Sequence, residues 1–178
     1  MIRDIVAVDR NGGMAKDGKT PWHIPADIAY FHERTKRFGG NLLVGRGSYE
    51  AMKKGVTARE GEAAWPPAGR HLYVLTSQSL PVADGVTVVH SLPDFLARMA
   101  VAGKDVWNGS IAEIEPDEIY LTRIDADYDC DKFYPMERLR HFRLVSSQPG
   151  QSLPGEPAYR YEVYTRITSV KGEAPHGK

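Results

Sequence analysis

The sequence has only one cysteine, Cys130, among its 178 residues. A single cysteine cannot close a disulfide within the chain, which is typical of proteins that work in a reducing compartment. No apolar run approaches the roughly 18 residues that a membrane-spanning helix requires. The opening stretch, MIRDIVAVDRNGG, also has too short an apolar run for a signal peptide. We therefore expect a cytoplasmic protein that does not contact a membrane.

The chain also lacks an excess of charge of either sign. Its 23 Lys and Arg residues equal its 23 Asp and Glu residues, so the formal net charge is zero. A protein that binds nucleic acid through its phosphates usually carries a basic field, so we expect no nucleic-acid partner. The length is typical of one domain, and we expect it to span residues 1–170, followed by a flexible tail at 171–178. We also expect a monomer.

Several common functional motifs are missing. The sequence contains neither the GxGxxG pattern of Rossmann folds nor the GxxxxGK[ST] pattern of P-loops. Its six histidines show no metal-ligand spacing. The alternating acids from Asp125 to Asp131 resemble a calcium loop, but Cys130 and Met136 stand where that loop needs glycine and an acid. We expect no metal site.

Short apolar runs alternate with helical patterns along most of the chain. Helices are predicted from Pro25, over 49–52 with Ser48 as the cap, and over 92–100, while the polar stretch Lys53–Trp65 is interpreted as an inserted surface loop. Strands are predicted at 5–8, 41–44, 71–75, 86–89, 105–107 and 118–124, with a final hairpin at 142–147 and 159–168. This order predicts an α/β domain with a mostly parallel sheet, an antiparallel C-terminal hairpin and helices on both faces.

Glycine and hydroxyl residues follow three of the predicted strands, where open α/β sheets bind their ligands. The segments are Val44–Ser48 (VGRGS), Leu75–Gln78 (LTSQ) and Val106–Ser110 (VWNGS). A helix N-terminus beside glycine can bind phosphate, and Arg46 adds a fixed positive charge. Each segment alone is also compatible with a plain turn or a helix cap.

The stretch TPWHIPADIAYF places Asp27 at the start of a helical pattern. An acid in the first helical turn can simply complement the helix dipole. The alternative is a carboxylate in an apolar cleft, with Trp22 and Phe31 as its walls. Loss of water would then raise its pKa toward values useful for proton transfer, and two hydrogen bonds could hold a flat amidine-like ring.

Taken together, these residues resemble the dihydrofolate reductase family. The resemblance covers about Ile2 to Thr168 and rests on motifs that occur in the family's order: Ile5–Asp9, Pro21-Trp22, Pro25-x-Asp27, Phe31, Thr35, Gly45–Glu50, Gly69-Arg70, Val74–Ser77, Ile119–Ile124 and Asp131–Pro135. It implies a dihydrofolate reductase-like fold and the reduction of 7,8-dihydrofolate to 5,6,7,8-tetrahydrofolate with NADPH. A hydride would pass to the pterin C6, with protonation at N5. It also implies that antifolates bind.

The resemblance further implies residue roles. Asp27 would hold the pterin and favour its protonation, Thr122 would support Asp27, and Trp22 would close the pocket. Ile5, Ala7, Phe31 and Met52 would contact the substrate, and Arg70 would clamp the carboxylate of the glutamate tail. The cofactor would be held by Ala7, Ala15, Gly18, Lys19, Gly45, Arg46, Gly47, Ser48, Leu75, Thr76, Ser77, Asn108, Gly109 and Ser110.

One segment departs from the family pattern. The family has a pair of glycines and a helix with a tyrosine after the strand that carries Trp107. Here Asn108 occupies the position of one of the two glycines, and Pro116 would end the helix after about one turn. We therefore expect weaker NADPH binding than is usual in the family. Two alternatives remain open: the related pyrimidine reductase of riboflavin synthesis, and a non-catalytic folate or nucleotide binder.

Overall fold

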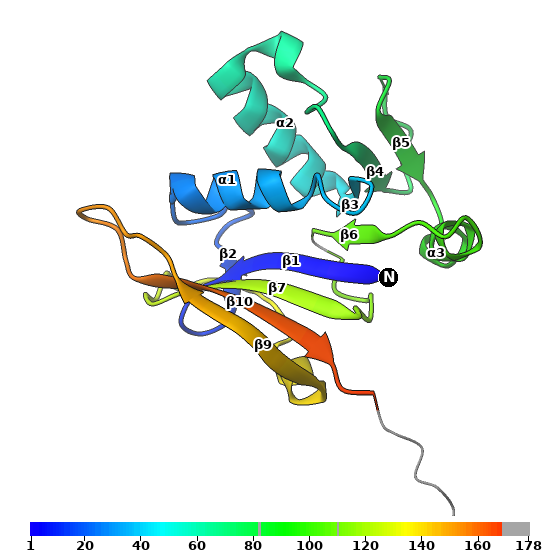
Figure 1. The fold of residues 1–178 in the computed structure, drawn as a ribbon. Coiled ribbons are helices and arrows are strands. Elements are labelled where there is room, and N and C mark those ends of the chain that lie inside the picture. The colour runs from blue at the N-terminus through cyan, green and yellow to red at the C-terminus, as the bar shows by residue number, and fades with distance from the viewer. Residues whose placement is uncertain (82, 110, 169–178) are drawn as a thin grey trace, which may run out of the picture.

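The computed structural model describes residues 1–81, 83–109 and 111–168 and shows one eight-stranded sheet, with strand order β5-β4-β3-β6-β1-β7-β10-β9 (Figure 1). The pairs from β5 through β7 are parallel, and β10 is antiparallel to both β7 and β9. The strands of this sheet are β1 Ile2–Val8, β3 Asn41–Gly45, β4 His71–Leu75, β5 Val86–Val89, β6 Val106–Asn108, β7 Glu118–Ile124, β9 Phe142–Pro149 and β10 Tyr159–Arg166. The predicted fold class is confirmed.

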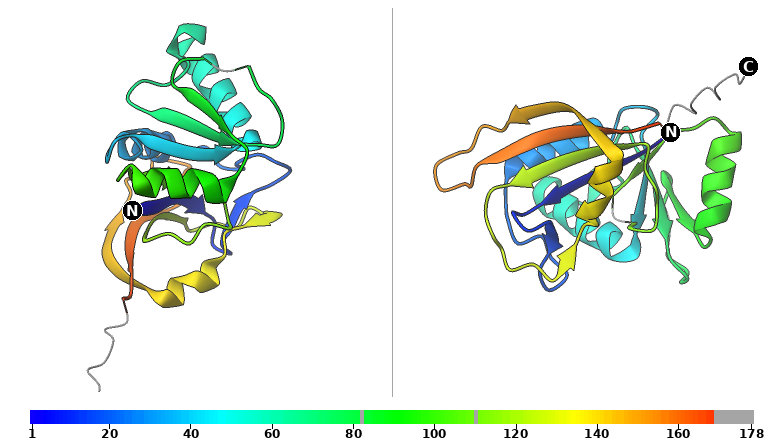
Figure 2. Two further views of the ribbon diagram at one scale, coloured as in Figure 1. Left: turned by 90° about the vertical axis from the view of Figure 1, so that its right-hand side faces the viewer. Right: turned by 90° about the horizontal axis from the view of Figure 1, so that it is seen from below.

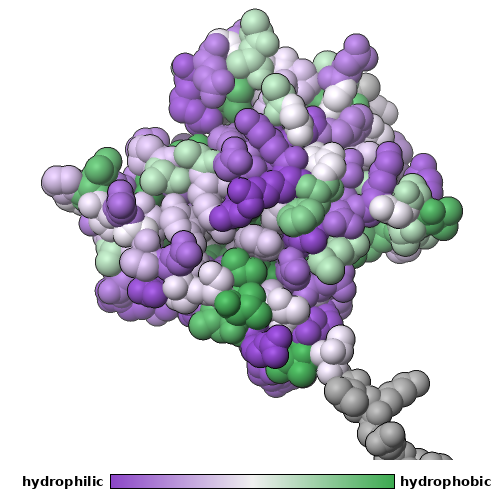
Figure 3. All heavy atoms as spheres, in the orientation of Figure 1, coloured by the Kyte–Doolittle hydropathy of each residue, from purple (hydrophilic) through white to green (hydrophobic). Residues whose placement is uncertain are grey.

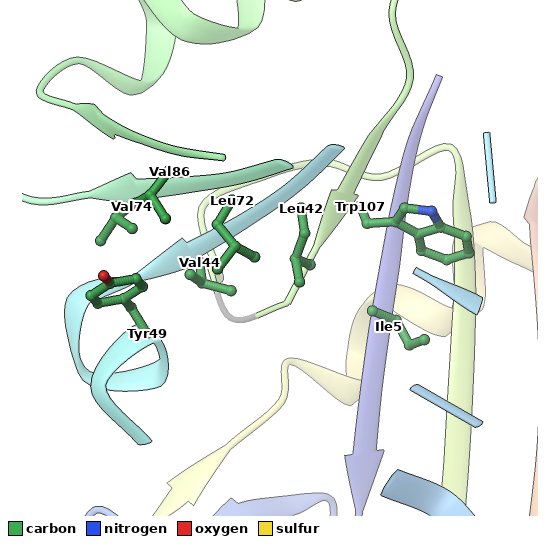
Figure 4. Close-up of a cluster of buried hydrophobic side chains, with 8 residues drawn as sticks. All are labelled: Ile5, Leu42, Val44, Tyr49, Leu72, Val74, Val86 and Trp107. Atoms are coloured by element: carbon green, nitrogen blue, oxygen red, sulfur yellow. The ribbon is translucent and has the colours of Figure 1, made fainter. Parts of the chain in front are cut away.

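Helices cover both faces of the sheet because neighbouring strand residues point to opposite sides. Leu42 and Val44 of β3 lie with Tyr49 in one buried cluster, which Figure 4 shows together with side chains of β1, β4, β5 and β6. The helices on this face are α1 (Pro25–Arg34) and α2 (Arg46–Glu60). Leu43, between the two β3 residues, packs instead with Phe95 and other residues of α3 (Leu92–Val101) on the other face.

The expectation of a surface loop over Lys53–Trp65 is wrong. Helix α2 continues to Glu60, and a 3-10 helix, η1, follows at Glu62–Ala64. The reason is packing: Tyr49 and Val56 are both buried, and they recur at helical spacing within a segment that is otherwise polar. Ser48 is also not the cap, because the helix begins at Arg46 after Gly45 and has no side-chain cap.

The expected short helix after Trp107 does not form in the described residues 109 and 111–117, which contain a bend at Gly109 and a turn at residues 112–113. The side chain of Asn108 forms hydrogen bonds to the backbone of Ile111, as described below. Pro116 has no N–H with which to extend a helix. A second, two-stranded sheet that the sequence did not indicate joins β2 (Gly13–Ala15) to β8 (Lys132–Phe133). It brings two loops that are distant in the sequence to the same end of the molecule.

The remaining 3-10 helix, η2 (Met136–His141), leads into β9, and Figure 2 shows the β9–β10 hairpin at one edge of the sheet. On the face in Figure 3 polar residues predominate, with apolar groups between them. Leu144 and Val145 of β9 are among the exposed large apolar residues. Single exposed apolar side chains are ordinary on a globular surface. The predicted tail at 171–178 lies outside the described residues. Among the helices that the structure describes, none has both the length and the apolar character needed to cross a bilayer.

Candidate active site

A cleft of about 680 Å³ opens at the carboxyl ends of β1 and β7, between α1 and the beginning of α2. This is the place where open α/β sheets bind ligands, because several strand ends and loops converge there. Twelve of the residues that the sequence singled out line it: Ile5, Ala7, Ala15, Gly18, Lys19, Trp22, Asp27, Phe31, Gly47, Ser48, Gly109 and Thr122. Residues from both halves of the chain therefore form one site.

Asp27 lies in the first turn of α1, and its carboxylate is bonded across the cleft. The Thr122 hydroxyl, on β7, donates a hydrogen bond of 2.8 Å to Asp27 Oδ1. Burial raises the pKa of Asp27 above its ordinary value of 3.8, while the Thr122 hydrogen bond acts in the opposite direction. A carboxylate in this state can accept hydrogen bonds from a heterocycle and influence its protonation near neutral pH. Asp27 therefore makes a contact across the cleft in addition to its place in the first helical turn.

Apolar and aromatic side chains surround that carboxylate. Trp22 is only 9 % exposed, and its ring lies 5.4 Å from that of Tyr128. Tyr30 lines the cleft and stacks on Tyr161 with 4.2 Å between ring centroids. Burial, followed by the nearby Asp27 charge, raises the pKa of the Tyr161 hydroxyl, so this phenol stays protonated. Aromatic rings therefore form part of the cleft wall, against which a flat ring could pack.

Arg70 and Met52 lie outside the residues that line the cleft. Arg70 Nη1 lies 2.5 Å from His32 Nδ1 and 3.3 Å from the Thr35 hydroxyl. Its Nε is buried and has no hydrogen-bond partner in the described structure. An unpartnered buried guanidinium nitrogen is costly unless a ligand completes it, and a carboxylate is the ligand that fits it best. Met52 packs, with Phe31, against the cluster that contains Tyr49.

The beginning of α2 fits a phosphate group. It has no side-chain cap and no acid in its first turn, and both Gly47 and Ser48 line the cleft. Arg46 forms a 3.7 Å ion pair with Glu50, and both side chains are partly exposed. Because Gly45 pairs in register with Leu75, the strand ends that carry Arg46 and Thr76 are neighbours. Free N–H groups, a small residue and nearby hydroxyls are what a phosphate-bearing cofactor such as NADPH needs.

Asn108 does not line the cleft, because its side chain closes the turn behind it. Its Nδ2 donates to Ile111 O (2.8 Å) and to Asp4 Oδ1 (2.8 Å), and its Oδ1 accepts from Ile111 N–H (2.9 Å). Asp4 is buried and also accepts from Tyr134 (2.6 Å) and Arg138 (3.2 Å). This network fixes the turn after β6, the segment for which the sequence predicted a short helix.

The same turn leaves few backbone donors for a ligand. Gly109 N–H is bonded to Leu43 O at 3.0 Å, and Ile111 N–H is bonded to Asn108. These N–H groups are already satisfied inside the protein. The expected weakening of NADPH binding stays a prediction, and this arrangement supports it. Ser110, which the resemblance assigned to the cofactor, lies outside the described residues.

The loop that contains Gly18 and Lys19 is tied to the acidic loop near β8. Asp131 accepts a 2.9 Å hydrogen bond from Asp17 N–H, and its own N–H donates to Ala15 O at 2.9 Å. Lys16 pairs with Asp129 at 3.2 Å on the exposed side. These contacts hold the loop over the cleft, because Ala15, Gly18 and Lys19 all line it.

Sequence reasoning missed nine residues that line the cleft: Val6, Met14, Thr20, His23, Ile24, Ile28, Tyr30, Ala51 and Lys132. Helical spacing from Phe31 back to Ile28 and Ile24 was a usable signal for two of them. Lys132 gave no such signal, because it reaches the site only through the pairing of β8 with β2. The described residues contain no group of three or more His, Cys, Asp or Glu side chains placed to hold a metal ion.

Comparison with known proteins gives one consistent family. A sequence model described as dihydrofolate reductase matches residues 1–166. The chain is 28 % identical to dihydrofolate reductase from Bacillus subtilis, covering 96 % of this chain and 98 % of the relative, and 29 % identical to that from Enterococcus faecium, covering 96 % and 99 %.

A solved structure gives the same result. Dihydrofolate reductase from Enterococcus faecalis, complexed with NADP(H) and RAB-propyl, superimposes with a TM-score of 0.75 at 29 % identity, covering 94 % of this chain and 97 % of that one. The chain belongs to the dihydrofolate reductase family.

Proposed function

We propose that Asp27 is the residue through which this chain carries out the reaction of its family, the NADPH-dependent reduction of 7,8-dihydrofolate to 5,6,7,8-tetrahydrofolate. The observation that carries this proposal is its carboxylate, which is hydrogen-bonded to Thr122, shielded from water by burial and located in the cleft that Trp22 and Phe31 also line. A carboxylate at this place can bind the amidine-like edge of a pterin through two hydrogen bonds.

The reaction adds a hydride to C6 of the pterin and a proton to N5. NADPH, when bound, supplies the hydride. The negative charge of Asp27 stabilises positive charge on the ring and so favours the protonated N5 form. Thr122 orients the carboxylate and lowers its pKa, and Trp22 closes the cleft against water. The protein thus contributes orientation, electrostatics and exclusion of solvent.

The remaining residues divide between substrate and cofactor. Ile5, Ala7, Phe31 and Met52 would contact the substrate, and Arg70 would bind a carboxylate of its glutamate tail. The unpartnered Arg70 Nε supports that role. NADPH would be held by the first turn of α2, the ends of β4 and β6 and the loop over the cleft, through Ala7, Ala15, Gly18, Lys19, Gly45, Arg46, Gly47, Ser48, Leu75, Thr76, Ser77, Asn108, Gly109 and Ser110.

The two alternatives have less support. Every comparison above leads to dihydrofolate reductase rather than to the pyrimidine reductase of riboflavin synthesis. A binder that had lost catalysis would not need the bond between Thr122 and Asp27, yet that bond is present.

We also propose that residues 1–170 act as one domain, as a monomer and in the cytoplasm. One continuous sheet uses strands from Ile2 to Arg166, which supports a single domain. The only cysteine, Cys130, forms no disulfide, as is ordinary in a reducing compartment. Sedimentation at several concentrations tests the monomer.

The function is tested by following NADPH oxidation in the presence of dihydrofolate. We expect Asp27→Asn to lower kcat/KM by about 100-fold or more at neutral pH, the range of a lost acid–base group. Part of the loss should be recovered at acidic pH, where the substrate arrives already protonated. Asp94→Asn is a matched control, since Asp94 occupies the first turn of α3, away from the cleft. Equal activity of Asp27→Asn and wild type would disprove the assignment.

A further inference from the structure

Lys132 lines the cleft although it belongs to the short strand β8, in the C-terminal half of the chain. Its side chain is exposed. In the part of the chain that the structure describes, no carboxylate lies within ion-pair distance of its ammonium group. Among the described residues that line the cleft, Asp27 is the only acid. Lys132 therefore brings a positive charge without a counter-charge to the cleft.

The backbone around Lys132 is fixed by its pairing with β2. Lys132 pairs with Ala15 in the two-stranded antiparallel sheet, and Ala15 also lines the cleft. On one side of the lysine, Asp131 N–H donates to Ala15 O at 2.9 Å. On the other side, Tyr134 N–H donates to Gly12 O at 3.0 Å. The lysine side chain thus extends from a fixed place at the edge of the cleft.

The acidic residues next to Lys132 in the sequence have other partners. The carboxylate of Asp131 accepts a hydrogen bond of 2.9 Å from Asp17 N–H. The carboxylate of Asp129 pairs with Lys16 at 3.2 Å. The acidic loop therefore holds the loop over the cleft and leaves the charge of Lys132 available to a ligand.

The end of β6 provides few N–H donors for an anion, as described above. Gly109 N–H is bonded to Leu43 O, and Ile111 N–H is bonded to Asn108. The beginning of α2 does offer N–H groups to the cleft. NADPH carries two separate anionic groups, however: the diphosphate that joins its two halves and the 2′-phosphate of its adenosine. A cation in the same cleft would meet the need for charge that the turn after β6 leaves.

We infer that Lys132 is a cofactor-binding residue, and that its ammonium group provides the counter-charge for the NADPH diphosphate. A lysine suits this role because its compact charge sits on a long, flexible stem and hydrogen-bonds strongly to phosphate oxygens. The inference rests on the proposed function and deepens it, since it adds a residue of β8 to the cofactor site. The charge of Lys132 would offset part of the weakening expected from the turn at Asn108.

The test uses three nucleotides that differ in their phosphates. NADPH has both anionic groups, NADH has the diphosphate alone, and adenosine 2′-monophosphate has the 2′-phosphate alone. Quenching of tryptophan fluorescence gives the dissociation constants of NADPH and NADH, and displacement of NADPH gives that of adenosine 2′-monophosphate. Lys132→Gln should weaken NADPH and NADH each by about fivefold, as for a partly exposed charge pair. It should leave the binding of adenosine 2′-monophosphate unchanged.

Two further variants serve as controls. Lys132→Arg keeps the positive charge and should retain most of the affinity for NADPH. Lys104→Gln removes an exposed charge before β6 and should leave all three dissociation constants unchanged. The difference between wild type and Lys132→Gln should shrink at high salt, because salt screens exposed charges. A purely structural effect of the substitution would not depend on salt in this way.

The outcomes are distinct. If Lys132→Gln binds NADPH as tightly as the wild type, or weakens adenosine 2′-monophosphate as much as NADH, Lys132 does not bind the diphosphate. The proposed function still stands in either case, provided that the wild type reduces dihydrofolate. If the wild type neither binds NADPH nor reduces dihydrofolate, the proposed function itself fails, and the inference fails with it.

Discussion

The hydroxyl of Thr122 donates a 2.8 Å hydrogen bond to the carboxylate of Asp27, and so joins a strand of the C-terminal half to the first helix. This bond lowers the pKa of Asp27 against the larger effect of burial. The proton affinity of the carboxylate is thus set by two residues that are far apart in the sequence. Their pairing leads to the first two predictions.

Replacing Thr122 with valine should shift the pH dependence of the reaction. Without the hydroxyl, burial acts on Asp27 unopposed, so its pKa should rise further. The pH profile of kcat/KM should move toward higher pH. Thr165→Val, which alters a half-buried threonine of β10 outside the cleft lining, should leave the profile in place. An unshifted profile in Thr122→Val would contradict the assigned bond.

Asp27→Asn should stabilise the protein at neutral pH even as it lowers activity. Because burial raises the pKa of Asp27 above 3.8, the folded state binds this proton more tightly than the unfolded state does. The ionised form therefore costs stability at pH 7, and the cost vanishes as the pH falls through the raised value toward 3.8. We expect a gain of about 1 kcal/mol, or about 2–4 °C in Tm. Thermal unfolding at several pH values checks this, and a gain that persists undiminished at pH 4 would refute it.

Asn108→Ala should weaken NADPH binding more than dihydrofolate binding. The change removes three hydrogen bonds and takes one donor from the buried Asp4 carboxylate, at a cost of about 2–3 kcal/mol in unfolding free energy. The loosened turn should raise KM for NADPH severalfold. Asn41→Ala is the matched control, because Asn41 is also buried and donates to Asp105 O at 3.1 Å. Equal effects of both variants on KM for NADPH would show that Asn108 acts only through stability.

Asp131→Ala should loosen the loop over the cleft. The change removes the acceptor of Asp17 N–H, so the residues from Ala15 to Lys19 lose one of their ties to the acidic loop. We expect faster NADPH release and a higher KM for NADPH, as for other loops that gate a cycle. Stopped-flow displacement of NADPH measures the release. Asp127→Ala serves as control, because the Asp127 carboxylate bonds within its own loop, to Asp129 N–H.

Val56→Ala tests whether α2 is a packed helix as far as Glu60. Val56 is 3 % exposed, so truncation should cost about 1–2 kcal/mol of unfolding free energy through lost burial and a small cavity. Val101→Ala is the same change at a residue that is 91 % exposed, and it should cost almost nothing. Urea unfolding gives both values. If Val56→Ala and Val101→Ala had the same free energy of unfolding, residues 53–65 would form the surface loop that the sequence predicted.

The sequence alone determined features that depend on local order. Apolar runs such as Leu42–Val44 and the capped helix that begins after Ser91 form where their patterns indicated, because burial of one face and satisfied backbone groups act over a few residues. The order of Trp22, Asp27 and Phe31 likewise determined that part of the cleft where one carboxylate and two aromatic side chains line it, since the three lie within a single loop and helix.

Only the tertiary structure decided the rest. The length of α2 depends on Val56 finding a buried place, which a polar segment does not reveal. The Asn108 side chain holds its turn partly through a hydrogen bond to Asp4, 104 residues away in the sequence. Arg70 likewise contacts His32, 38 residues away. Hydrogen bonds and charges act over a few ångströms, and only folding brings residues so distant in the chain within that range.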